Sequence, residues 1–301
     1  MQTTRWADLE TDDINEAIKL ILKPKQPDKS YNNWDIKKKF EENQSILLNG
    51  KKITFNYISY SYDYILSSDN SSIEDMIRRQ DGFIIVYDNG VKINYIISKN
   101  SGALTFMRKL LGYTGRNQIV VNNLPINSEL FVWLISKVYN SDSTIESEDF
   151  EDNDAQNLTI DAIKGFKGNS DDLLTKVSAN GESVMNILST LSFLLESRSL
   201  NQIIIDLQCN KHKNLELTLT AKSTLAISLE TYIGEFENDC KELCISKLYL
   251  LVYLELLPLI IQAMQKEKED GLWNNVHYVE FLKNVAAELS QRVKKKIQSL
   301  E

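Results

Sequence analysis

The sequence predicts an α+β fold with two mixed lobes and a C-terminal pair of long helices. Alternating apolar segments bounded by turn residues predict antiparallel hairpins and a meander, and apolar residues three and four positions apart predict amphipathic helices. One acidic stretch separates two such mixtures, and 301 residues is the length of about two domains. The predicted organisation is an N-terminal lobe at 1–141, an acidic linker or loop at 142–157, a second lobe at 158–236 and a helical hairpin at 237–301.

The N-terminal lobe begins with a predicted amphipathic helix over 12–22, which Pro24 ends. Residues 53–66 alternate and are rich in β-branched and aromatic types, so they predict a strand. Residues 82–98 predict a hairpin, because two apolar strands flank Asn89-Gly90 and this pair readily takes the positive φ angles of a tight turn.

Two further helices are predicted in the same lobe, separated by a short strand over 118–121. The first covers 101–111, with Asn100 or Ser101 as its N-cap and Gly112 at its end. Its predicted apolar face consists of Leu104, Met107, Leu110 and Leu111. Asn127 is the predicted N-cap of the second helix, and Ile126 is expected to pack on Phe131 as a hydrophobic staple.

The second lobe is predicted to contain a strand at 158–166, a helix at 181–196 and a hairpin. The hairpin joins strands 202–209 and 215–221 through the loop 210–214, and 225–233 is expected to extend the meander. Two long helices, at about 237–268 and 276–299, end the chain. The apolar run 248–264 contains Glu255 and Pro258, so it predicts a buried helix kinked at the proline rather than a membrane span.

The acidic stretch carries seven Asp and Glu residues between positions 142 and 154, with no Lys or Arg. Like charges repel one another and such a stretch has few apolar groups to bury, which predicts an exposed linker or long loop. The functional alternative is an acidic arm that mimics nucleic acid or docks on a basic partner.

Composition indicates a cytoplasmic protein. Three cysteines do not form a disulfide scaffold, and the first residues, MQTTRWADLETDD, are too polar for a signal peptide. Asn, Ile and Lys are abundant and Ala is scarce, which is typical of an AT-rich bacterial or mobile-element gene.

Several enzyme classes lose support because their motifs are missing. The chain has two histidines, His212 and His277, and no HExxH pair. The GxSxG elbow, the P-loop and the GxGxxG cradle are also absent. We therefore expect no cofactor, and no family is recognisable from motifs.

Two metal-dependent chemistries retain weak candidates. A zinc site would use Cys209, His212, Cys240 and Cys244, although the simpler reading of the paired cysteines is that they are small buried groups. A divalent-metal-dependent nuclease would use Asp81, Asp88 and Lys99, with Asp206 in the second hairpin. Acidic residues at hairpin ends are, however, ordinary turn residues.

A basic region of the N-terminal lobe suggests binding of nucleic acid or another anion. Residues 78–137 carry eight basic and three acidic side chains. Aromatic residues on strand 53–66 offer stacking partners for bases. The predicted patch is centred on Arg108, Lys109 and Arg116, with Arg78, Arg79 and Lys99 as outer contacts, and the predicted stacking face carries Ile58, Tyr60, Tyr62 and Tyr64.

The C-terminal helices suggest a different activity, the binding of another subunit. The last helix carries Phe281, Val285, Leu289, Val293 and Ile297 on its predicted apolar face. Such a face is buried within the domain or against another subunit, so homo-oligomerisation is an open expectation. The sequence thus favours a non-catalytic intracellular protein that binds nucleic acid or a partner subunit and makes no membrane contact. An accessory role in a bacterial mobile-element or phage-defence system fits the composition, and the metal-dependent nuclease is the alternative.

Overall fold

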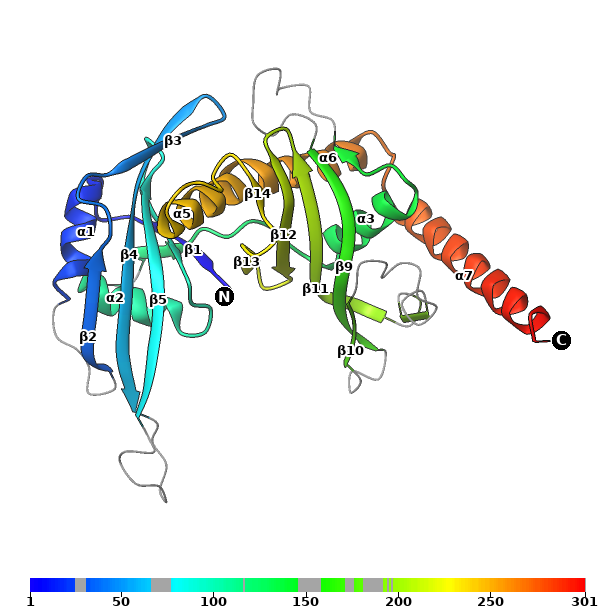
Figure 1. Ribbon diagram of the computed structural model, residues 1–301, viewed down its shortest axis with the longest axis horizontal. Helices are drawn as coiled ribbons and strands as arrows, with labels where there is room; N and C mark the ends of the chain where they lie inside the picture. Colours follow the sequence, from blue (N-terminus) through cyan, green and yellow to red (C-terminus); the bar gives the residue numbers. More distant parts are fainter. Residues whose placement is uncertain are drawn as a thin grey trace. The chain divides into compact units, whose positions relative to one another are not determined.

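A computed structural model describes residues 1–24, 31–65, 77–115, 117–145, 158–170, 176–180, 192–193, 195 and 197–300. The described chain is α+β, as predicted, with two antiparallel sheets of seven strands each (Figure 1). It forms two compact units. The first unit comprises Met1–Asn123 and Asn238–Leu251, and the second comprises Leu124–Glu237 and Val252–Glu301. The predicted lobe boundaries remain predictions, and the predicted helix at 181–196 lies mostly outside the described residues.

The sheet of the first unit has the strand order β2-β4-β5-β6-β1-β7, and β3 pairs with the end of β4. All of its neighbouring strands are antiparallel. Its strands are β1 (Thr4–Asp8), β2 (Tyr31–Lys38), β3 (Gln44–Leu48), β4 (Lys51–Ile65), β5 (Ile77–Asp88), β6 (Ile93–Ile97) and β7 (Ile119–Val121).

The predicted hairpin over 82–98 is confirmed as β5 and β6, but its turn is longer than expected. Asp88 pairs with Ile93, so four residues form the loop. Only Gly90 of the Asn-Gly pair has a positive φ, at 79°. The Asn89 side chain instead accepts hydrogen bonds from the backbone N–H groups of Val91 and Lys92. An Asx turn therefore replaces the two-residue turn that the sequence predicted.

Helices cover both faces of this sheet. α1 (Ile14–Leu22) and α2 (Ala103–Leu111) pack on one face. α5 (Lys241–Leu251) packs on the other, where the ring of Tyr249 lies 5.6 Å from that of Phe83. Asp13 caps α1 by accepting the N–H of Asn15.

Two expectations for α2 are wrong in detail. Gly102, not Asn100 or Ser101, occupies the N-cap position, and no side chain caps the helix there. Leu104 is 40% exposed, and Phe106 takes the buried position instead. Gly112 ends the helix with φ 73°, as expected.

The second unit contains a sheet with the strand order β10-β9-β11-β12-β13, with β8 paired to β9 and β14 paired to β12. Its strands are β8 (Thr144–Ile145), β9 (Leu158–Ser170), β10 (Lys176–Asn180), β11 (Ser197–Cys209), β12 (His212–Thr220), β13 (Leu225–Ile227) and β14 (Ile233–Gly234). The β11–β12 loop is Asn210-Lys211, because Cys209 pairs with His212, so the predicted five-residue loop is wrong. The predicted strand 225–233 is limited to β13 and β14.

α3 (Ser128–Tyr139) packs against β9 and β11 in the second unit. Asn127 caps it by accepting the N–H of Leu130, as predicted. The first residues of the predicted acidic linker are structured, because β8 pairs with β9 and the Asp142 carboxylate contacts Lys137. Residues 146–157 lie outside the described part of the chain.

The predicted helix at 237–268 is α5, a π-helical turn, η3 (Val252–Leu256), and α6 (Leu257–Glu269). Pro258 lies in the first turn of α6. Because proline has no N–H to donate, the wider π turn accommodates it. Lys241–Glu269 is long and apolar enough to cross a membrane, but 72% of its most apolar window is buried inside the protein, as in the core helix of a soluble-type fold. The last helix is α7 (Asn275–Gln298).

Candidate functional site

The cations of the predicted anion patch are partly used in local contacts of the first unit. Nη2 of Arg108 donates to the carbonyl of Thr114 at 2.7 Å. Arg79 pairs with the Asp63 carboxylate at 3.1 Å and also bonds to Ser61. The Lys99 ammonium lies 3.1 Å from the Tyr62 hydroxyl. These contacts therefore occupy part of the hydrogen-bonding capacity of the three cations.

The other members of the patch are placed differently. Arg78 is exposed on β5, and Lys109 is half-buried on α2. Arg116 lies outside the described residues. The predicted cluster of Arg108, Lys109 and Arg116 therefore stays a prediction.

The predicted stacking face is part of the core, which corrects the expectation for the aromatic side chains. Tyr60 and Tyr62 are 4% and 2% exposed, and Ile58 is fully buried. The ring of Tyr62 lies 4.9 Å from that of Trp34, and the ring of Tyr60 lies 4.9 Å from that of Phe106. α1 and α2 cover this face of the sheet, so these rings are not available for bases.

The pKa of Tyr60 agrees with this burial. Burial raises the pKa of Tyr60 to about 12. The side chain of Tyr64 lies outside the described residues, so its expected role in stacking is not tested.

The weak nuclease candidates are not gathered at one place. Asp81 and Asp88 lie seven residues apart on β5, a separation of about 23 Å along a strand. The Asp88 carboxylate accepts the N–H of Gly90 in the hairpin turn. Asp206 belongs to the second unit, where its carboxylate contacts the Lys164 ammonium at 3.0 Å.

The weak zinc candidates also fall into separate environments. Cys209 and His212 belong to the second unit, and His212 Nδ1 lies 2.7 Å from the Tyr232 hydroxyl. Cys240 and Cys244 belong to the first unit, where burial raises the pKa of the Cys244 thiol. Within the described residues, no group of three or more His, Cys, Asp or Glu side chains could hold a metal ion.

The second unit contains a polar network between α3 and α6. Glu267 accepts hydrogen bonds from Trp133 Nε1 at 2.7 Å and from the Lys137 ammonium at 2.8 Å. Lys137, whose side chain is 11% exposed, also contacts Asp142 at 2.5 Å. Burial alone would lower the pKa of Lys137, but the hydrogen bonds to Asp142 and Glu267 outweigh it and raise that pKa. Lys137 is therefore a structural cation that joins α3 to α6.

The first half of α7 is anchored to this part of the unit. Phe281 and Val285 are buried, and the Phe281 ring meets the Tyr139 ring edge-on at 5.5 Å. Burial and the Glu288 carboxylate raise the pKa of Tyr139 to about 12. Asn274 caps the helix by accepting the N–H groups of Val276 and His277.

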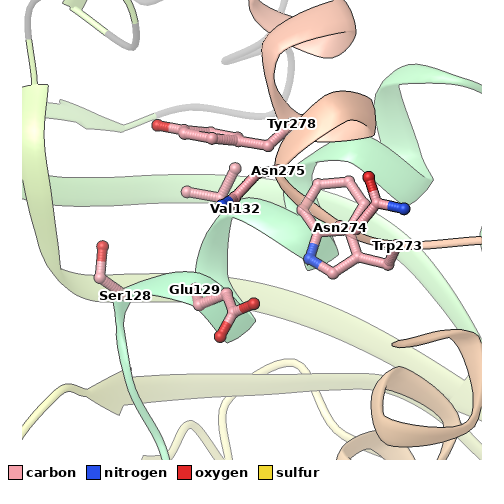
Figure 2. A pocket seen from close by; sticks show the side chains of 7 residues that line it. All are labelled: Ser128, Glu129, Val132, Trp273, Asn274, Asn275 and Tyr278. Atoms are coloured by element: carbon pink, nitrogen blue, oxygen red, sulfur yellow. The ribbon is translucent and has the colours of Figure 1, made fainter. Parts of the chain in front are cut away.

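A pocket of about 240 Å³ opens beside these anchors (Figure 2). Figure 2 shows Tyr278 above the pocket and Glu129 below it. Glu129 is already paired with Lys268 at 2.8 Å, and Asn274 is used as the helix cap. The pocket is lined by Ser128, Glu129, Val132, Trp273, Asn274, Asn275 and Tyr278. It offers aromatic surface but few uncommitted polar groups.

The second half of α7 leaves this support, and Figure 1 shows the helix running away from the strands of its unit. Only Phe281 and Val285 are buried along the whole helix. A second set of apolar residues follows it at spacings of three and four, and we call this set the apolar stripe. The apolar stripe consists of Val279, Leu282, Ala286, Leu289, Val293 and Ile297 on α7, together with Leu300 in the turn just past its end.

Much of the apolar stripe is in contact with solvent. Val293, Ile297 and Leu300 are 42%, 52% and 76% exposed. Leu282 and Leu289 are half-buried. The sequence predicted a single apolar face for this helix. The structure divides it into a buried face, with Phe281 and Val285, and an exposed one. The heptad-like spacing of three and four was the signal that could have separated them.

Cations follow the apolar stripe on both sides. At about 100° per residue, Lys283 and Lys294 lie along one edge and Arg292 and Lys296 along the other. Arg292 also forms an ion pair with Glu288 one turn earlier. The other three form no ion pair with any residue that the structure describes.

Comparison with protein-family models and with curated proteins finds no match. The strongest feature is the exposed apolar stripe of α7 with its basic edges.

Proposed function

We propose that this protein is a non-catalytic interaction protein that binds a partner subunit through α7. The observation that carries the proposal is the apolar stripe, which follows a long helix with its second half in solvent. Scattered exposed apolar residues are normal on a protein surface, whereas a continuous row at heptad spacing is typical of a helix–helix interface.

Energetics favour a covered stripe. Fully burying a Val, Leu or Ile side chain stabilises by about 1.5–3 kcal/mol. The summed exposed fraction of three residues, Val293, Ile297 and Leu300, corresponds to more than one and a half fully exposed residues. Covering them would contribute about 3 kcal/mol to association. A partner helix would also stabilise the second half of α7, because a short helix alone in water is marginally stable.

The other expectations stay proposals with less support. Nucleic-acid binding loses its stacking surface, because Tyr60 and Tyr62 are buried. The nuclease alternative lacks a cluster of carboxylates among the described residues. A cytoplasmic accessory role in a bacterial mobile-element or phage-defence system is compatible with partner binding and guides the choice of probes.

The test uses the products of the genes that flank this one. Each is co-expressed with the full chain, and complex formation is measured by size-exclusion chromatography with light scattering. We expect Val293→Glu with Ile297→Glu to abolish a complex that the unchanged chain forms. The matched control is Gln291→Glu with Gln298→Glu, which adds the same two charges on the opposite side of α7 and should leave the complex intact. A complex that resists the first double change would place the interface elsewhere.

A further inference from the structure

We infer that the segment docking on α7 is a helix with acidic edges in a different chain, not a second copy of α7. This inference rests on the proposed function, because it specifies the chemistry of the partner at the same surface. Its basis is the charge that borders the apolar stripe on both sides.

The width of the apolar stripe points to a helix as the occupant. Its six positions within α7 fall within an arc of about 80° when successive residues are turned by 100°. A helix that packs on a domain core presents an apolar face of about 100° or more, and a narrower row is typical of a seam between two helices. A helix lying in a lipid interface also buries a broad apolar face. The narrow stripe thus favours a helical partner over a membrane surface.

Basic residues along both edges of the apolar stripe favour a partner with acidic residues at the facing positions. Lys283 and Lys294 border it on one side, and Arg292 and Lys296 border it on the other. Residues 289–300 contain no Asp or Glu, and Glu288 offsets only Arg292. Residues at such edges set partner choice in paired helices, because they face the edges of the neighbouring helix.

A second copy of α7 is a poor match in either orientation. Both edges are basic, so parallel pairing and antiparallel pairing each bring cations of one helix beside cations of the other. Charges on the facing edges of two paired helices lie closer together than the screening length of about 8 Å at physiological salt, so like charges there repel each other. Glu288, the one acidic residue between positions 281 and 300, is already paired with Arg292. The same edges would attract Asp and Glu of an acidic partner.

Three synthetic helical peptides of about 21 residues provide the probes. All carry the same Leu and Ile residues, one with Glu at the edge positions and one with Lys there. The third keeps the composition of the Glu peptide but scatters its apolar residues. Binding to the full chain is measured by calorimetry at 50 mM and 300 mM NaCl.

We expect the Glu-edged peptide to bind at least tenfold more tightly than the Lys-edged one, with the difference shrinking at high salt. Replacing Lys294→Glu and Lys296→Glu together should reverse the preference. Lys295→Glu is the matched control, because Lys295 points about 160° from the centre of the apolar stripe and its replacement should change the preference little.

The outcomes separate the inference from the proposed function. Equal binding of the Glu-edged and Lys-edged peptides overturns the acidic partner and leaves docking on α7 standing. Binding of the scattered peptide as tightly as the Glu-edged one means attraction by charge alone, which overturns both. A chain that light scattering finds to be a dimer, and that Val293→Glu with Ile297→Glu makes monomeric, establishes a second copy as the occupant and overturns the inference. Failure of all peptides, with binding to phosphatidylglycerol vesicles but not to phosphatidylcholine vesicles, replaces the helix with a membrane surface.

Discussion

The two long helical stretches that end the chain differ in how apolar content relates to burial. Lys241–Glu269 has a mean hydropathy of 1.9 in its most apolar window, and most of that window is buried in the same chain. α7 is far more polar, yet it leaves a row of apolar side chains in solvent. The more apolar helix is therefore a core element, and the less apolar helix offers the surface that another molecule can cover.

The two helices also differ in the surface that they leave for a partner. The apolar run 248–264 was predicted to form a buried helix, and all of its leucines and isoleucines except Leu254 are covered by the chain itself. α7 has half-covered residues and basic edges, which are features of a surface that recognises a partner. A dense run of apolar residues thus indicated burial within the chain, whereas the spacing and exposure of the apolar residues on α7 indicate a surface for a partner.

Matched isoleucines in the two helices give the largest expected difference. Ile260 of α6 is fully buried, whereas Ile297 of α7 is 52% exposed. Ile260→Ala should lower the free energy of unfolding by about 2–5 kcal/mol, because it removes buried methyl groups and leaves a cavity. Ile297→Ala should lower it by less than about 1 kcal/mol. Urea unfolding of both variants makes the comparison, and equal losses would show that α7 is covered within its own chain.

The polar network at the base of α7 gives the next largest effect. Glu267→Ala would leave Trp133 Nε1 and the Lys137 ammonium without their shared carboxylate, although Lys137 would keep Asp142. We expect a loss of about 1–3 kcal/mol in the free energy of unfolding, the typical cost of an unsatisfied buried donor. The control is Glu269→Ala, because Glu269 is exposed two residues away. Similar losses in both variants would contradict the structural role of Glu267.

The smallest expected effect concerns pH. Hydrogen bonding from Tyr139 and pairing with Arg292 hold the pKa of Glu288 below its ordinary value of 4.5. A carboxylate with a lowered folded-state pKa contributes stability above its ordinary value, and this contribution is lost as the pH falls through the folded-state value. We therefore expect stability to decline below about pH 4.5, and Tyr139→Phe to reduce that decline relative to the unchanged chain. Tyr278→Phe is a suitable control. Identical pH profiles for all three chains would contradict the contribution of this contact.

Local sequence signals were sufficient for many elements. Asn127 caps α3 where expected, because its short polar side chain binds a free N–H group of the first turn within its own few residues. Gly112 ends α2 because glycine adopts the left-handed conformation without strain. The hairpin of β5 and β6 follows equally from two apolar runs and the turn residues between them.

The sequence alone could not settle which faces are covered. Alternation on strand 53–66 identifies two faces, but only the packing of α1 and α2 places Tyr60 and Tyr62 in the core rather than in solvent. The anion patch stays a prediction, but the structure shows what its sequence could not: Arg79 contacts Asp63 and Lys99 contacts Tyr62, both on β4.

The apolar residues of α7 show the same division between sequence and tertiary structure. Helical spacing predicted one face, and its apolar content was sufficient to predict an amphipathic helix. Only the position of Tyr139 on α3 separates buried Phe281 from exposed Ile297, which lies sixteen residues further along the same helix. The amino-acid sequence by itself determined where elements begin, end and alternate, because those preferences act over a few residues. The tertiary structure decided which apolar surface stays in water, because burial depends on contacts between segments far apart in the chain.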